Sequence, residues 1–201
     1  EMGQLLAGPF TGTILSYFGA EVIKVEPPGG DPIRKWRLLK DGTSLWYYSL
    51  GRNKKSVTLD LKPERGRELA GKLLDTADVV IENFRPDVKD KLGINYDALK
   101  AVNPRIILGS ISGFGQDGPY AKRPGFDQIA QGMGGLMSIT GEPGRGPMRV
   151  GIPIADLTGG LFCAMGVLIA IIEREKSGEG QWVQSSLLQS MAFMLDFQGA
   201  R

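Results

Sequence analysis

The chain is organised around the stretch Val150-Gly151-Ile152-Pro153-Ile154-Ala155-Asp156-Leu157-Thr158-Gly159-Gly160, which joins an apolar segment to a long apolar helix. One acid, Asp156, stands at the junction, and we predict that it is the N-cap of this helix, because aspartate is favoured there. Backbone N–H groups and the helix dipole would then keep the carboxylate ionised and immobile, which suits a nucleophile. The alternative is that Asp156 only caps the helix.

The residues that follow Asp156 predict a tightly packed helix. Gly159 and Gly160 are disfavoured in a first turn, so we expect the backbone to approach a ligand or another chain closely there. The apolar run Leu157–Ile172 is shorter than the roughly 20 residues of a membrane span. It predicts a buried helix, in which Cys163 is a structural thiol.

Composition bounds the class of protein. The chain has 201 residues, 42% of them hydrophobic and 23% charged, which is ordinary for a single soluble domain. A net charge of +2 argues against partners such as nucleic acid or a membrane surface. The single cysteine excludes an internal disulfide and fits a reducing compartment, and no signal peptide is visible. A cytoplasmic location is expected, or the mitochondrial matrix in a eukaryote.

The chain contains no histidine, which restricts its chemistry. Triads and dyads that activate a nucleophile through histidine are excluded, as are zinc sites of the H-E-x-x-H type. No metal site is predicted. Catalysis within this chain must use carboxylates, lysine, tyrosine or backbone dipoles.

Strands and helices alternate along the sequence. The predicted strands are Val22–Glu26, Ser56–Leu61, Asp78–Glu82, Arg105–Ile111 and Gln181–Gln184. The other predicted helices are Thr11–Phe18, Pro63–Thr76, Val88–Lys91, Tyr96–Val102, Phe126–Leu136 and Leu187–Phe197. This order predicts an α/β fold with a Rossmann-like, doubly wound, mostly parallel sheet and helices on both faces.

Ligands of such sheets bind beyond the carboxyl ends of the strands. Here those ends carry Glu26-Pro27-Pro28-Gly29, Asn83-Phe84-Arg85-Pro86 and Ser112-Gly113-Phe114-Gly115, which are expected to converge on one rim. The polar and aromatic segment Asp31–Lys55 is either a surface excursion or a loop that binds phosphate or stacks on adenine.

A dinucleotide-binding turn is an alternative for the first helix and strand, with Glu26 as the acid that binds ribose. The G-x-G-x-x-G fingerprint is absent, since only Gly8 and Gly12 are present. This alternative would make the chain a nucleotide-binding module without covalent chemistry.

Several ordered motifs together resemble the family III CoA-transferases, which include formyl-CoA transferase and carnitine CoA-transferase. The motifs are Leu6-Ala7-Gly8-Pro9, Gly19–Arg34, Asn53-Lys54-Lys55-Ser56, Glu82–Pro86, Ser112–Gln116, Ala155-Asp156 and Gly178-Glu179-Gly180-Gln181. Members are about twice as long and form interlocked dimers. The resemblance therefore implies that residues 1–201 form one Rossmann-like CoA-binding domain, which is truncated at both ends and lacks the family's small domain. It also implies that the full-length protein is a homodimer.

The resemblance also implies a mechanism. The family's nucleophilic aspartate matches Asp156, which attacks an acyl-CoA thioester to form an acyl-aspartyl anhydride and then an aspartyl-CoA thioester. A carboxylic acid acceptor then takes the CoA. Coenzyme A is thus a substrate, and no permanently bound cofactor is expected. A related alternative is an α-methylacyl-CoA racemase that uses Asp156 as an acid and base. Its histidine matches Phe126, however, and we expect Asp127 to point elsewhere.

The resemblance extends to the residues that bind CoA. The matching positions are Leu5, Leu6, Ala7, Arg34, Leu59, Lys62, Asn83, Phe84 and Lys91, and Arg85 is added because it follows a strand. Leu6 and Pro124 stand where formyl-CoA transferase has glutamine and lysine, which argues against oxalate and formate as substrates. The sequence does not identify the acyl donor and acceptor.

Overall fold

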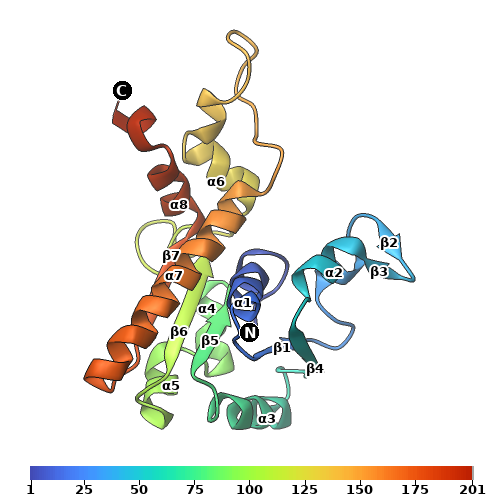
Figure 1. The fold of residues 1–201 in the computed structure, drawn as a ribbon, viewed down its shortest axis with the longest axis vertical. Coiled ribbons are helices and arrows are strands. Elements are labelled where there is room, and N and C mark those ends of the chain that lie inside the picture. Colours follow the sequence, from blue (N-terminus) through green and yellow to red (C-terminus); the bar gives the residue numbers. More distant parts are fainter. Residues whose placement is uncertain (201) are drawn as a thin grey trace.

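The computed structural model describes residues 1–200 (Figure 1). The strands are β1 (Val22–Glu26), β2 (Leu39–Lys40), β3 (Thr43–Ser44), β4 (Lys54–Thr58), β5 (Val79–Glu82), β6 (Ile107–Ser112) and β7 (Trp182–Ser186). The α-helices are α1 (Ala7–Tyr17), α2 (Leu45–Leu50), α3 (Glu64–Leu74), α4 (Pro86–Leu92), α5 (Tyr96–Val102), α6 (Asp127–Met133), α7 (Ile154–Ser177) and α8 (Leu187–Met194). The 3-10 helices are η1 (Pro32–Lys35), η2 (Leu136–Ile139) and η3 (Asp196–Ala200).

The first residues of the chain connect two groups of parallel strands. β1 pairs with β4, and β6 lies between β5 and β7. The Val25 N–H donates to the Glu1 carbonyl (2.8 Å) and the Met2 N–H donates to the Ile81 carbonyl (2.8 Å), so residues 1–3 lie between β1 and β5. Counted with that segment as the first strand, the spatial order is 3-2-1-4-5-6. This is the strand order of the Rossmann fold, with its reversal between residues 1–3 and β5, and it agrees with the Rossmann-like parallel sheet that the sequence predicted.

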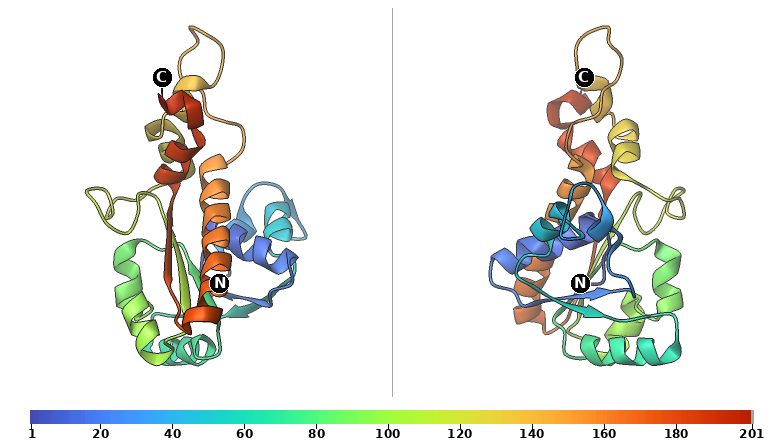
Figure 2. Two further views of the ribbon diagram at one scale, coloured as in Figure 1. Left: turned by 60° about the vertical axis from the view of Figure 1, so that its left-hand side comes forward. Right: turned by 90° about the vertical axis from the view of Figure 1, so that its right-hand side faces the viewer.

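Helices cover both faces of the sheet (Figure 2). Residues alternate along β6: Ile107 and Ile111 join the core beneath α1 and α7, whereas Leu108 belongs to the core on the side of α3 to α5. This alternation follows from the two-residue period of a strand. A third, smaller cluster of Leu6, Ile33 and Leu50 connects α1 to the lobe that carries α2, β2 and β3.

The long helix α7 is buried on one side only. Cys163 and Val167 face the sheet and are fully buried, as predicted for the thiol, and burial raises the pKa of Cys163 to about 12. The opposite side is exposed and apolar, as are two phenylalanines of α8 and η3; the residues are Leu161, Met165, Leu168, Ile169, Ile172, Phe193 and Phe197. The sequence predicted a buried helix, but only one side of α7 is buried. Small residues face the sheet, and large apolar residues face away from it.

The same helix is apolar enough to cross a membrane by length and composition, with a mean hydropathy of 2.0 over its most apolar window. Core helices pass the same test. In the structure α7 packs on α1, β6 and β7.

Some helix ends differ from the sequence prediction. α1 begins at Ala7 rather than Thr11, with Pro9 in its first turn, where a missing N–H is tolerated. α6 ends at Met133 rather than Leu136, because Gly134 and Gly135 follow and Gly135 adopts a φ of +86°.

Candidate active site

Asn83 links the two chain segments that flank the reversal of strand order. Its side-chain oxygen accepts from the Gln4 N–H (2.8 Å), and its side-chain nitrogen donates to the Gln4 carbonyl (2.9 Å). A Cβ added at Gly3 or Gly8 would lie 2.9 or 3.1 Å from the Asn83 oxygen, so a side chain at either position would press on Asn83. Asn83 thus joins the turn after residues 1–3 to the end of β5 and brings the predicted contacts Leu5, Leu6 and Ala7 beside it.

Buried charged side chains also stabilise the turn after residues 1–3. Leu5 has a φ of +62°, and its N–H donates to the Asp31 carboxylate (3.1 Å). Lys24 Nζ lies 2.9 Å from both Asp31 and Glu1, and Lys54 Nζ lies 2.7 Å from Glu1. All four side chains are almost fully buried. A non-glycine residue is thereby kept in the left-handed region that it would otherwise avoid.

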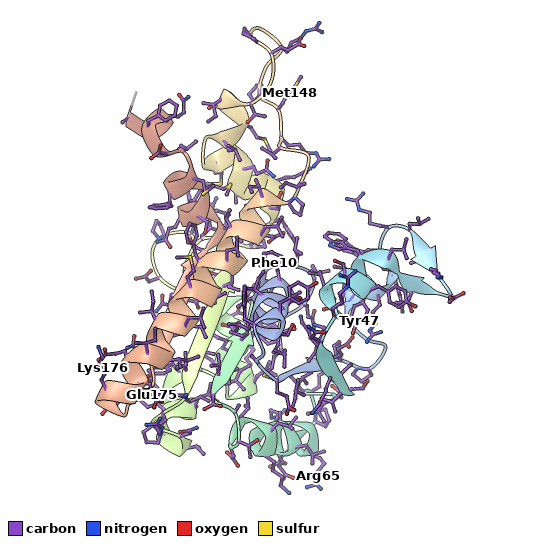
Figure 3. The ribbon with its side chains drawn as sticks, viewed as in Figure 1. Phe10, Tyr47, Arg65, Met148, Glu175 and Lys176 are labelled. Carbon is purple, nitrogen blue, oxygen red and sulfur yellow. The ribbon has the colours of Figure 1, made fainter. Side chains whose placement is uncertain are left out.

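Helix α7 reaches this turn through α1. The Thr11 hydroxyl donates to the Gly160 carbonyl (3.0 Å), and a Cβ at Gly160 would lie 2.8 Å from the Ala7 carbonyl. Phe10, labelled in Figure 3, also faces Gly160. The close approach predicted for the glycines is real, but at Gly160 the neighbour is α1 of the same chain rather than a ligand or another chain.

Asp156 lies in the first turn of α7 but is not its N-cap, so that prediction was wrong. The helix begins at Ile154 after Pro153. Its N–H groups are capped by a carboxylate from α6: Asp127 accepts from Ala155 N–H (2.8 Å) and Asp156 N–H (3.3 Å). The expectation that Asp127 points elsewhere was also wrong. Local sequence favours Asp156 as a cap, but a distant carboxylate satisfies the same donors.

This arrangement reverses the expected ionisation of Asp156. Burial, followed by the neighbouring charge of Asp127, raises the pKa of the Asp156 carboxyl to about 7. The side chain is half-buried, and no donor within residues 1–200 stabilises its anion. Near neutral pH both protonation states are populated, a condition typical of carboxylates with a chemical role.

Gln131 completes the connection between α6 and the loop before α7. It is fully buried; its Nε2 donates to Asp127 (2.7 Å), and its Oε1 accepts from the Val150 N–H (2.8 Å). Sequence reasoning missed Asp127 and Gln131 as a pair. Their i,i+4 spacing on a predicted helix was the available signal, but it did not show what they bind.

The end of β1 is closed by Glu26. Its carboxylate accepts from Arg34 Nε (2.6 Å), Tyr47 hydroxyl (2.9 Å) and Ser56 hydroxyl (2.6 Å). Burial would raise the pKa of Glu26, but these hydrogen bonds and one from the Asp31 N–H outweigh it and hold the pKa well below its usual range. Glu26 therefore has no oxygen left for a ribose, which removes the support for a dinucleotide-binding turn.

The model of CoA-transferase family III matches residues 1–201. The chain belongs to this family.

Two relatives and one solved structure illustrate the match. The chain is 46% identical to the succinyl-CoA–D-citramalate CoA-transferase of Chloroflexus aurantiacus, over 98% of this chain and 49% of the relative. It is 44% identical to the succinate–glutarate CoA-transferase of Agrobacterium fabrum, over 97% and 51%. The structure of a CAIB/BAIF family protein from Brucella suis matches with a TM-score of 0.95 and 43% identity, over 99% of this chain and 54% of that one. The chain thus spans about half the length of the curated relatives it matches.

Four cations were assigned to CoA, three by the family resemblance and Arg85 by its position after a strand, and their partners in the structure differ. Arg34 is paired with Glu26 and stacks on the ring of Tyr47 (3.7 Å to its centre). Tyr47 is labelled in Figure 3. Arg85 and Lys91 both pair with Asp87 (3.2 and 3.3 Å) on the surface. Among residues 1–200, Lys62 is the one of the four without a carboxylate partner. It is exposed and follows β4.

The apolar positions assigned to CoA lie along the same edge of the sheet. Leu59 is half-buried after β4, and its N–H donates to the Glu26 carbonyl (2.8 Å). Phe84 is half-buried after β5, and its N–H donates to Glu82 (2.7 Å). Within residues 1–200, no group of three histidine, cysteine, aspartate or glutamate side chains is placed to hold a metal ion.

Proposed function

We propose that the full-length protein transfers CoA from an acyl-CoA thioester to a free carboxylic acid, with Asp156 as the covalent nucleophile. The observation that carries the proposal is the position of Asp156. It is half-buried with a pKa near 7, at the start of a helix that packs on α1 beside the crevice at the reversal of strand order. Ligands of this fold bind in that crevice.

Each proposed step exchanges one anion for another. The Asp156 carboxylate attacks the thioester carbonyl, and the C–S bond breaks to give an acyl-aspartyl anhydride and CoA thiolate. The thiolate attacks the Asp156 carbonyl carbon and releases the first carboxylate. The acceptor carboxylate then attacks the carbonyl carbon of the aspartyl-CoA thioester. CoA thiolate leaves, and a second anhydride forms between Asp156 and the acceptor. The thiolate finally attacks the acceptor's acyl carbon and restores Asp156.

Each addition to a carbonyl forms an oxyanion that needs hydrogen-bond donors. The first N–H groups of α7 are already used by Asp127, Ile152 and Pro153. Within residues 1–200 no side chain caps α1, so the N–H groups of Ala7 and Gly8 in its first turn remain for a ligand. We assign the oxyanion donors of this chain to that turn.

The relatives support a dicarboxylate as substrate. Their names include succinyl-CoA, succinate, glutarate and citramalate. Leu6 and Pro124 depart from formyl-CoA transferase, so within this class we favour dicarboxylates longer than oxalate. We therefore propose succinyl-CoA as donor and a small dicarboxylate as acceptor.

The assembly and location are part of the proposal. The exposed apolar side of α7 supports an interlocked homodimer in the full-length protein, because an apolar face of this extent is usually covered by protein. The balanced charge supports neither nucleic acid nor a membrane surface as a partner. The single buried cysteine supports a cytoplasmic location.

Chemical trapping tests the covalent step. Incubation of the full-length protein with succinyl-CoA and then hydroxylamine is expected to convert Asp156 to a hydroxamate. Trypsin would release residues 150–174 as one peptide, in which Asp156 is the only aspartate and Glu173 the only other acid. Mass spectrometry of that peptide should place the modification on Asp156. An unmodified peptide from an enzyme that is active in CoA transfer would disprove the mechanism.

The CoA phosphates provide a second prediction. Lys62→Ala should raise the KM for succinyl-CoA roughly tenfold, since a hydrogen bond to a charged group contributes about 1.5 kcal/mol or more. The increase should be smaller at high salt, which already screens the wild-type attraction. Lys72→Ala is the matched control, because Lys72 is exposed near the opposite end of α3. Equal KM values for both variants would show that the phosphates bind elsewhere.

A further inference from the structure

Asp127 occupies a position from which it acts on Asp156 in two ways. We propose that Asp127 is a positioning residue of the transferase: it fixes the backbone of Asp156 and disfavours the free carboxylate of Asp156 relative to its acylated forms. The inference rests on the proposed function and assigns a task to a second acid of the same site.

The first task is geometric. One Asp127 oxygen accepts from the N–H groups of Ala155 and Asp156, at 2.8 and 3.3 Å, and the other accepts from Gln131 at 2.7 Å. Gln131 in turn holds the loop before α7 through the Val150 N–H. The start of α7 is therefore fixed from α6 on both sides of Pro153, so Asp156 keeps its place while its side chain reacts.

The second task is electrostatic, and it depends on which charges face Asp156. Asp127 is the acid on α6, and α1 carries no charged residue. The next charged residue on α7 is Glu173. In the preceding loop, exposed Arg149 donates to the carbonyls of Val150 and Gly151. In the lobe beside Leu157, the cation Arg34 is paired with Glu26.

The charge of Asp127 therefore acts on Asp156 without a compensating cation from these elements. Repulsion and burial act only on the free anion, because the anhydride and the CoA thioester of Asp156 are both neutral. Acylation and protonation both convert the charged carboxylate into a neutral group. An interaction that disfavours the anion therefore favours both. Asp127 thus increases the population of the covalent intermediates.

Three variants of the full-length protein separate these tasks. Asp127→Asn removes the charge and retains an oxygen acceptor, Asp127→Glu retains the charge, and Asp117→Asn removes an exposed aspartate as the matched control. The readouts are the pH profile of kcat/KM and, by intact mass spectrometry, the fraction of enzyme present as the CoA thioester.

The acid limb of the wild-type profile is expected near pH 7, because only the ionised Asp156 attacks. Asp127→Asn should move it about one pH unit lower, since a like charge is removed. The thioester fraction relative to free enzyme should fall about tenfold, the equivalent of one pKa unit. Asp127→Glu should keep the limb near that of the wild type while lowering kcat, and Asp117→Asn should change neither readout.

The outcomes distinguish this inference from the proposed function. A wild-type enzyme that forms no covalent adduct would refute the function itself. An adduct in the wild type, with an unchanged acid limb and thioester fraction in folded Asp127→Asn, would overturn only the role of Asp127. If Asp127→Asn fails to fold, Asp127→Ser is the second uncharged variant. If that also unfolds, an acid limb that moves well below pH 7 in Asp127→Glu overturns the inference.

Discussion

Asp156→Asn in the full-length protein is expected to lower kcat/KM for CoA transfer by at least about 10³-fold, because the amide cannot form the anhydride and removal of a covalent nucleophile has effects of this size. The fold should survive. The side chain of Asp156 caps no helix and accepts no hydrogen bond from residues 1–200. The thermal midpoint should even rise, since a half-buried carboxylate without donors is removed.

The size of this stability change depends on pH. The folded pKa of Asp156 is raised from 3.8 to about 7, so the folded state binds more protons than the unfolded state between these values. The wild type therefore loses stability as pH rises through this window, and the loss is complete above pH 7. Asp156→Asn should be more stable than the wild type at pH 8 and show little difference at pH 4. Asp117→Asn, an exposed substitution of the same kind, should keep full activity. Transfer within tenfold of the wild type in Asp156→Asn would place the nucleophile elsewhere.

The sequence predicted those features that depend on repeating patterns. β1 was predicted with its observed bounds, because the largely apolar run Val22–Glu26 is followed by two prolines and two glycines. The convergence of strand ends was predicted from the parallel order of the strands, and the contact between Gln4 and Asn83 joins one of these ends, after β5, to the turn after residues 1–3. Strand order and chain direction restrict where such segments lie before any side chain is placed.

The features that sequence missed arise from partners far away in the chain. Asp156 has the local signature of an N-cap, but the capping carboxylate comes from Asp127, 29 residues earlier. A short-range pattern does not show that these donors are already occupied. Arg34 is a similar case: the family resemblance and its place in the polar segment Asp31–Lys55 suggested a phosphate ligand, whereas Glu26 binds its guanidinium. In both cases the residue type indicated a charged interaction, but the sequence did not identify the partner.

The buried charges beneath the Leu5 turn give the other large expected effect. Lys24→Met should destabilise the folded protein by about 3–5 kcal/mol, the usual result of removing one partner of a buried ion pair. Lys24 is 2% exposed, and its Nζ contacts Glu1, Asp31 and the Gly3 carbonyl, each at 2.9 Å. Burial would lower the pKa of Lys24, but the attraction of Glu1 and Asp31 outweighs it and raises the pKa. This stabilisation is therefore fully present at pH 7 and is lost only above the usual lysine range.

Urea unfolding of the full-length protein measures the change, with Lys55→Met as the matched control. Lys55 lies on the neighbouring strand in an ion pair with Glu21 that is 70% exposed at the lysine, and its loss should alter the free energy of unfolding by less than about 1 kcal/mol. In Lys24→Met the KM for succinyl-CoA should also rise, because Asp31 would no longer be held against the Leu5 N–H and the turn beside Asn83 would relax. Equal stability of the two variants would mean that the buried charges do not hold this turn, and that Leu5 keeps its left-handed conformation by packing alone.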